Sequence, residues 1–397
     1  MAPAATLPER PLAPDALRGA AVLGMALMVV HGFALPGPAA INPTAYGATS
    51  PADIRVWLAS FVFLEDKLRA IFAMLLGAGC MILLERGDAN PWRAHYARMT
   101  VLFAIGFAHW VLLADHDVLR GLALAGLALP LLAGLSARAL IAVSFGLVIA
   151  QFAMGMSALG AAFIVFHVKH SGTEALLLAE RQFGHDPATI ALLLEQGRAG
   201  LAERIIRQLG AVPSQFGALI AALPLDLAGF ALGMGLHRAG MFKGEWRTFH
   251  LQRLAGLAAL LALPALFALA GWLVSTGFPA ALVGPVALVF SAPFDLLLAV
   301  SYAALAMAFV SRGTRVTRTL AAVGRLSLTN TVMTNMILGC IFAPWGLGLF
   351  GEVTRAGAFA LAFVPIIAVL VFSPLWVAKL GQGPLERLWR KAAKALS

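Results

Sequence analysis

Apolar stretches of about 20 residues recur from one end of the chain to the other, and short polar segments separate them. The hydrocarbon core of a bilayer is about 30 Å thick, and about 20 apolar helical residues cross it. The pattern therefore predicts an all-α fold, a polytopic helical membrane protein with about ten transmembrane helices. The predicted spans are residues 16–36, 56–84, 98–114, 119–135, 139–166, 211–236, 254–275, 284–310, 326–343 and 357–378.

Composition places the chain in the same class. Of its 397 residues, 60% are hydrophobic and only 12% are charged, whereas soluble domains carry about 25% charged residues. A soluble domain with a large core is thereby excluded, and the lipid bilayer is the expected partner. The two cysteines, Cys80 and Cys340, lie in apolar runs and form neither a disulfide framework nor a metal-binding spacing.

The distribution of basic residues predicts the orientation. Lys and Arg concentrate in alternate loops and in the C-terminal segment, and the positive-inside rule places such segments in the cytoplasm. Both termini are then cytoplasmic. The opposite loops nearly lack Lys and Arg, with Arg55 and Arg355 as the main exceptions. The net charge of +10 comes from the Lys- and Arg-rich cytoplasmic loops and the C-terminal segment. Because the positive-inside rule explains this charge, no nucleic-acid partner is predicted.

The domain organisation follows from these spans. Residues 1–15 are predicted to be a disordered cytoplasmic N-terminus, 16–378 a single transmembrane domain, and 379–397 a basic cytoplasmic tail. The long segment 167–210 is expected to lie outside the membrane as short surface helices. One of them should begin at Asp186-Pro187, a capping residue followed by proline at the first helical position, and stop at Gly197.

A cluster of charged residues, Glu65, Asp66, Lys67 and Arg69, interrupts the second apolar run. A charge at the centre of a spanning helix costs about 2.5–3.5 kcal/mol on the insertion scale, and such residues generally mark functional sites. On one continuous helix Glu65 and Asp66 would both pair with Arg69, while Lys67 would face the bundle and hold an anionic ligand. The four residues are candidates for substrate binding; ion pairing within the helix is the alternative.

Histidines supply the candidate catalytic groups. His109 lies within the third predicted span, and Asp115-His116-Asp117 follows at its outer end. A histidine beside carboxylates can act as a general base or a proton relay, although a solvated turn would explain Asp115 and Asp117 equally. His31, at the outer end of the first span, is either a second candidate base or an interfacial residue. No metal site is predicted, because no metal-ligand spacing is present.

Two further groups are candidates for binding substrate. Asp15 and Arg18 share one face at the cytoplasmic end of the first span, where Arg18 would contact an anionic ligand unless both residues only anchor the helix. Asn330 lies in an unusually polar ninth span, and it would orient a substrate or bond to a neighbouring helix. Asp226 and Asp295 are each near a proline, and we expect them to bond backbone amides freed at kinks.

Several motifs resemble one family of bacterial inner-membrane proteins. They run in order along nearly the whole chain: Asp15–Gly19, Asn42–Gly47, Lys67–Gly79, Gly106–His109, Asp117–Leu119, Gly324–Asn330 and Gly383–Arg390. The chain is identified by them as a member of the YeiB-like family, domain of unknown function 418, whose C-terminal signature region corresponds to residues 230–390 here. The resemblance implies a multi-pass protein of the bacterial inner membrane.

The same family is distantly similar to membrane acyltransferases, which move an acyl group onto a sugar or another polar acceptor. Those enzymes carry an Arg at the cytoplasmic end of the first span and a catalytic His or Asn eleven residues later. This chain has Arg18, but Val29 occupies the later position, and His31 lies about 200° further round the helix.

The resemblance implies acyl-CoA as a co-substrate, a small-molecule or lipid-linked acceptor, and no tightly bound cofactor. A transporter or lipid-handling protein with a polar pathway around residues 65–69 is the alternative function. Whether the chain is an enzyme, and whether it forms oligomers, stays open at this point.

Overall fold

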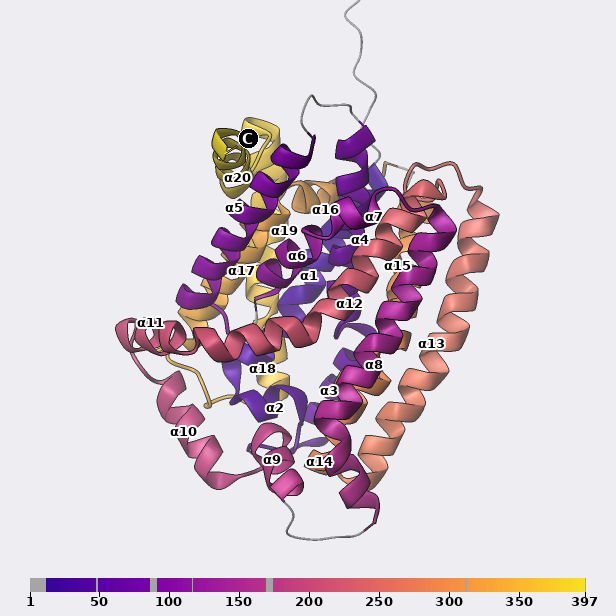
Figure 1. Cartoon of the computed structure of the whole chain (residues 1–397). Coiled ribbons are helices and arrows are strands. Elements are labelled where there is room, and N and C mark those ends of the chain that lie inside the picture. Colours follow the sequence, from indigo (N-terminus) through magenta and orange to yellow (C-terminus); the bar gives the residue numbers. More distant parts are fainter. Residues whose placement is uncertain are drawn as a thin grey trace, which may run out of the picture.

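The computed structural model describes residues 12–47, 49–85, 91–115, 117–168, 174–310 and 313–396, which form helices and no strand (Figure 1). The N-terminal helices are α1 (Leu12–Ala34), α2 (Gly37–Ile41), α3 (Pro51–Phe63), α4 (Lys67–Glu85), α5 (Pro91–Leu112), α6 (Val118–Gly126), α7 (Leu129–Leu132) and α8 (Ala137–His167). Three short helices follow: α9 (Glu174–Phe183), α10 (Pro187–Gly197) and α11 (Leu201–Gly210).

The remaining helices complete the bundle. They are α12 (Val212–Arg238), α13 (Thr248–Thr276), α14 (Ala280–Pro285), the π-helix η1 (Val286–Phe290), α15 (Ala292–Phe309), α16 (Arg315–Arg325), α17 (Ser327–Phe342), α18 (Arg355–Leu361), α19 (Phe363–Leu380) and α20 (Pro384–Leu396).

Seven helical segments of the described chain are long and apolar enough to cross a bilayer. They are Leu12–Ala34, Pro51–Glu85, Ala137–His167, Val212–Arg238, Thr248–Thr276, Ala292–Phe309 and Arg355–Leu380. The prediction of a polytopic all-α membrane protein is confirmed in this form. The predicted span 119–135 is wrong, because that stretch forms α6 of nine residues and α7 of four. Nine residues extend about 13 Å, less than half of the hydrocarbon core.

The prediction of one continuous helix over 56–84 is also wrong. α3 ends at Phe63 and α4 begins at Lys67, and between them Asp66 adopts a positive φ of 56°. A positive φ is incompatible with the right-handed helix. The side chains of residues 65–69 therefore do not follow the helical spacing from which the pairing of Glu65 and Asp66 with Arg69 was predicted.

α1 lies inside the bundle and packs against α4, α15, α16, α17, α18 and α19. Its contact with α16 is the closest, since a Cβ on Gly19 would lie 1.9 Å from the Leu320 carbonyl oxygen, and one on Gly324 1.8 Å from that of Asp15. Only glycine permits this approach of two backbones, as in many membrane helix pairs. The start of α1 and α20 lie at one end of the molecule, and α2, α9 and α14 lie at the other (Figure 1).

The terminal segments differ in detail from the prediction. Residues 1–11 of the predicted disordered N-terminus lie outside the described residues, and 12–15 already belong to α1. The predicted basic tail forms α20, which packs on α5 and donates a hydrogen bond from Trp389 Nε1 to the Arg98 carbonyl oxygen at 2.8 Å. In α10 the predicted start is confirmed, because Asp186 accepts a hydrogen bond from the Thr189 amide at 2.9 Å.

Candidate functional site

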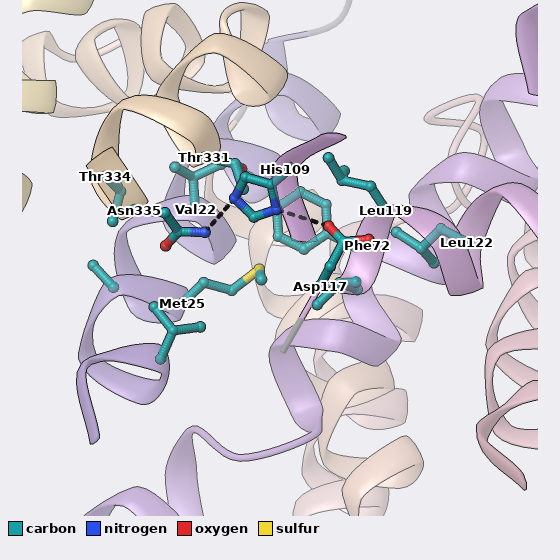
Figure 2. A pocket seen from close by; sticks show the side chains of 13 residues that line it. Val22, Met25, Phe72, His109, Asp117, Leu119, Leu122, Thr331, Thr334 and Asn335 are labelled. Carbon is teal, nitrogen blue, oxygen red and sulfur yellow. Dashed lines mark hydrogen bonds and ion pairs between the residues drawn. The ribbon is translucent and has the colours of Figure 1, made fainter. Parts of the chain in front are cut away.

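A chain of three polar side chains is buried between α5, the start of α6 and α17. His109 Nδ1 is 2.9 Å from Asp117 Oδ1, and His109 Nε2 is 2.8 Å from Asn335 Nδ2. The residues come from α5, from the residue that precedes α6, and from α17. Figure 2 shows the imidazole between the carboxylate and the amide. The His109 side chain is 3% exposed and that of Asp117 is 0% exposed, so both polar groups take their hydrogen bonds from the protein and not from bulk water.

The local sequence explains how Asp117 reaches His109. Asp117 is the N-cap of α6, and its Oδ2 accepts a hydrogen bond from the Arg120 amide at 2.8 Å. The buried Arg120 guanidinium lies 3.2 Å from the same oxygen and 4.3 Å from the centre of the Trp110 ring. The N-cap amide and the guanidinium together hold the Asp117 carboxylate in place. Its other oxygen, Oδ1, faces the imidazole.

The hydrogen bonds define the protonation pattern that fits this geometry. A carboxylate only accepts, so neutral His109 carries its proton on Nδ1 and donates it to Asp117. Nε2 is then the basic nitrogen, and in this conformation it accepts from the Asn335 amide. A histidine held in one tautomer by a carboxylate is an arrangement that can serve as a general base.

The imidazole faces a small cavity of about 30 Å³, which is room for one or two water molecules. Its lining is mostly apolar: Val22, Met25, Ala26, Val29, Phe72, His109, Asp117, Val118, Leu119, Leu122, Thr331, Thr334 and Asn335 (Figure 2). Val29 is thus on the cavity wall with His109.

Arg69 packs against Gly121 of α6 and does not line the cavity. Its Nε and Nη2 are each 2.7 Å from a carboxylate oxygen of Asp226 on α12. Gly121 of α6 packs directly on this pair, since a Cβ there would lie 2.5 Å from Asp226 Oδ2. The expected partners of Asp226, backbone amides at a kink, are therefore replaced by a guanidinium. The pair joins α4 and α12 and supports the helix that Asp117 caps.

Lys67 is also paired. Its Nζ is 2.6 Å from Asp295 Oδ1 on α15, and the two side chains are 1% and 4% exposed. Nζ also donates to the Phe61 carbonyl oxygen. The prediction that Lys67 is unpaired is wrong, and so is the prediction that Asp295 bonds backbone amides at a kink. The two side chains come from different helices and form an ion pair with each other. Glu65 and Asp66 lie in the break between α3 and α4, and none of residues 65–69 lines the cavity.

The other predicted catalytic residues lie elsewhere. Asp115 is at the surface, where its Oδ1 is 2.9 Å from Arg204 Nη2 and also accepts from Gln208 of α11. His31 is buried and stacks on Phe359, with 6.4 Å between the ring centroids. His116 lies outside the described residues. The structure thus brings His109 and Asp117 together and leaves Asp115 and His31 outside the cavity.

The predicted binding residues at the α20 end are separate from the cavity. Arg18 Nη1 is 3.5 Å from Asp15 Oδ1, and Arg325 Nε of α16 is 3.4 Å from Asp15 Oδ2. Asn330 is fully buried, and its Nδ2 donates to the Val323 carbonyl oxygen and to Ser373 Oγ, each at 2.9 Å. Asn330 therefore forms hydrogen bonds to residues of α16 and α19, which agrees with the predicted alternative of a bond to a neighbouring helix.

Asn335 and Arg120 complete the site, and sequence analysis did not select them. Asn335 lies five residues after Asn330 on the same polar helix, and the sequence does not indicate which of the two amides faces His109. Arg120 follows Asp117 at the i,i+3 spacing of a capping residue and its partner, which was a usable signal. Among the described residues no group of three or more His, Cys, Asp or Glu side chains is arranged to hold a metal ion.

Comparisons with known proteins agree on one family. The family described as "Protein of unknown function (DUF418)" matches residues 236–395. The chain is 30% identical to "Uncharacterized protein YeiB" of Escherichia coli (strain K12), over 96% of each chain. It is 24% identical to "Uncharacterized protein YxaH" of Bacillus subtilis (strain 168), over 95% of this chain and 92% of that protein.

Proposed function

Since the chain belongs to the YeiB-like DUF418 family, we propose that it is a membrane-bound acyltransferase that moves an acyl group from cytoplasmic acyl-CoA to a polar or lipid-linked acceptor. The observation that carries the proposal is the buried Asp117–His109 pair at the cavity. A buried general base with an oriented imidazole is what transfer to a hydroxyl or an amine requires.

In the proposed reaction the acceptor hydroxyl replaces the Asn335 amide at His109 Nε2. As its oxygen attacks the thioester carbonyl, the proton passes to Nε2 and the fixed charge of Asp117 stabilises the resulting imidazolium. The Asn335 amide is then free to donate to the oxyanion of the tetrahedral intermediate. Collapse of the intermediate forms the ester and breaks the C–S bond, and the imidazolium returns the proton to the thiolate of CoA.

The donor would bind from the α20 end of the molecule. Arg18 and Val29 are eleven residues apart on α1, which is about 16 Å along its axis. Arg18 would contact CoA phosphates at the membrane surface while the extended pantetheine arm reaches the cavity. Because the cavity has a volume of only about 30 Å³, its walls must separate to admit the acyl group.

The alternative function, a transporter with a polar pathway around residues 65–69, receives less support. Lys67 and Arg69 are each engaged by a buried carboxylate on another helix. Ion pairs of this kind hold helices together, and breaking them leaves a costly buried charge.

The proposed membrane orientation places both termini in the cytoplasm of a bacterium, with the chain in the inner membrane. It is supported by the location of the start of α1 and of α20 at one end (Figure 1). Single cysteines at the exposed positions Lys391 and Glu195, in a Cys340→Ala background, test it with a membrane-impermeant maleimide on intact spheroplasts. Labelling of Glu195→Cys alone is expected; labelling of Lys391→Cys alone would reverse the orientation.

Acyl transfer is tested with the purified full chain in lipid nanodiscs. Release of free CoA thiol is measured with acetyl-CoA and longer acyl-CoAs, with sugar and lipid hydroxyl acceptors present. His109→Gln should lower the rate by a factor of about 100 or more, and His250→Gln, an exposed histidine on α13, is the matched control. Absence of thiol release and of any thermal shift with acyl-CoA, in a folded protein, would overturn the proposal.

A further inference from the structure

A second cavity lies at the opposite end of α1, where α2, α3 and α18 meet. It has a volume of about 260 Å³, several times that of the cavity at His109. Its lining includes charged and polar side chains as well as apolar ones: Leu35, Ala39, Pro43, Tyr46, Gly47, Asp53, Gly351, Glu352, Val353, Thr354 and Arg355.

Arg355 is the unusual member of this lining. It is 4% exposed, and its Nη2 donates to the carbonyl oxygens of Ala39 and Ala40. Its Nε and Nη1 are buried without a hydrogen-bond partner. Since a guanidinium has five N–H donors, three of them have no acceptor. No carboxylate among the described residues lies within ion-pair distance of Arg355, and Glu65 and Asp53 interact with it only at longer range.

The two carboxylates of the lining are already occupied. Asp53 accepts hydrogen bonds from the Ser50 amide at 2.9 Å, the Ser50 hydroxyl at 2.6 Å and the Ala356 amide at 2.8 Å. Glu352 is 2.6 Å from Arg198 Nη2 of the loop after α10. Neither carboxylate of the lining is therefore in direct contact with the Arg355 guanidinium, although Asp53 interacts with it at longer range.

We propose that this cavity binds an oxyanion, a carboxylate or a phosphate, and that Arg355 is its ligand-binding residue. A buried guanidinium with three unpartnered N–H donors and no directly paired carboxylate is unfavourable. An anion that reaches Nε and Nη1 is itself removed from water, where charge-assisted hydrogen bonds are strongest. The sequence gives an independent indication, because Arg355 is one of the two main basic exceptions in otherwise Lys- and Arg-poor loops. The inference does not rest on acyl transfer.

Two sources can supply the same chemistry: a free anion in the aqueous phase or the phosphate of an anionic lipid. The full chain is reconstituted in phosphatidylcholine nanodiscs, and thermal unfolding is followed by tryptophan fluorescence. Inorganic phosphate and succinate are titrated at constant ionic strength. A second set of nanodiscs contains phosphatidylglycerol in place of part of the phosphatidylcholine.

The variants distinguish binding by the Arg355 guanidinium from a general effect of the positive charge of the protein. Arg355→Gln removes the guanidinium, and Arg355→Lys keeps a cation and a donor for the Ala39 and Ala40 carbonyls in case the glutamine variant does not fold. Arg55→Gln is the matched control, an exposed arginine on α3. We expect wild type and Arg55→Gln to bind alike, and Arg355→Gln and Arg355→Lys to bind at least tenfold more weakly.

Each outcome decides the proposal. A shift with phosphate or succinate that depends on Arg355 supports a free anion, and a shift confined to phosphatidylglycerol discs with the same dependence supports a lipid phosphate. No shift of the wild-type protein with any of the three anions would overturn the inference. A shift that the Arg355 variants retain in full would overturn it as well.

Discussion

His109 and Asp117 are eight residues apart in the chain, and only 2.9 Å separates His109 Nδ1 from Asp117 Oδ1. Eight residues on one continuous helix would span about 12 Å. The contact exists because α5 ends at Leu112 and the chain turns back before α6 begins at Val118. A single carboxylate therefore caps α6, neutralises Arg120 and fixes the imidazole.

Asp117→Asn should keep the size of the side chain and the helix cap but remove the negative charge beside Arg120 and His109. Asparagine still caps a helix, but Arg120 becomes a buried cation without its counter-ion, which costs about 3–5 kcal/mol. We expect the variant to unfold at a clearly lower temperature in detergent and to lose transfer activity by about 100-fold or more. Asp115→Asn, with a side chain 52% exposed, should change stability by no more than about 1 kcal/mol. Equal losses in both variants would contradict the role of Asp117.

The Lys67–Asp295 ion pair is buried on both sides and should dominate the packing of α4 on α15. Lys67→Met leaves Asp295 buried without its partner, so we expect a loss of about 3–5 kcal/mol in unfolding free energy. In Lys67→Met/Asp295→Leu both charges are gone, and most of that loss should be recovered. Denaturant unfolding of the two singles and the double variant measures the coupling. A double variant as unstable as the sum of the singles would show that the pair is not coupled.

Much of the fold could be predicted, because the length of an apolar run indicates whether a helix of that length can cross the hydrocarbon core of a bilayer. The errors occur where a helix breaks. The run 119–135 is apolar throughout, yet α6 ends at Gly126, where the side chain of Met99 packs, and α7 contains Pro130. The positive φ of Asp66 is likewise invisible to apolar periodicity. Hydropathy counts residues and does not report where a turn interrupts a run.

The candidate site was predictable only where its members are close in the chain. His109 and Asp117 are polar residues near one helix end, so their meeting could be anticipated. The partners of Lys67 and Arg69 could not be, because Asp295 and Asp226 lie on α15 and α12. A charge in an apolar run signals that a partner exists, but tertiary packing decides which helix provides it. The same limit applies to the polar ninth span, where packing decides that Asn335 contacts His109 and Asn330 contacts Ser373.

The crossing of α1 and α16 makes Gly324 sensitive to the smallest substitution. A Cβ at Gly324 would lie 1.8 Å from the Asp15 carbonyl oxygen, a backbone atom that can move away only if the two helices separate. Gly324→Ala should therefore lower the unfolding free energy by about 3 kcal/mol or more. Gly79→Ala on α4 is the control, because no atom lies within 4 Å of its added Cβ. There a gain of up to about 1 kcal/mol is expected, and unfolding in detergent compares the two.

Glu386 connects the C-terminal helix to the helix that carries Asn335. Its Oε1 accepts hydrogen bonds from the Leu328 amide at 2.8 Å and the Thr329 amide at 3.1 Å, which are donors of the first turn of α17. A carboxylate there satisfies amides that have no partner within the helix and interacts favourably with the helix dipole. Glu386→Ala should cost about 0.5–2 kcal/mol and speed hydrogen exchange at these two amides, measured by mass spectrometry.

The exchange experiment distinguishes a cap from a general effect of the tail. Lys391→Ala changes an exposed residue of α20 and should leave exchange in α17 as in wild type. Glu386→Gln keeps an acceptor but loses the charge, so its exchange rate should fall between those of wild type and Glu386→Ala. If exchange rose equally along all of α5 and α17, Glu386 would act through the docking of α20 on α5 and not through the cap. Faster exchange confined to the first turn of α17 would show that a tail residue fixes the helix from which Asn335 reaches His109.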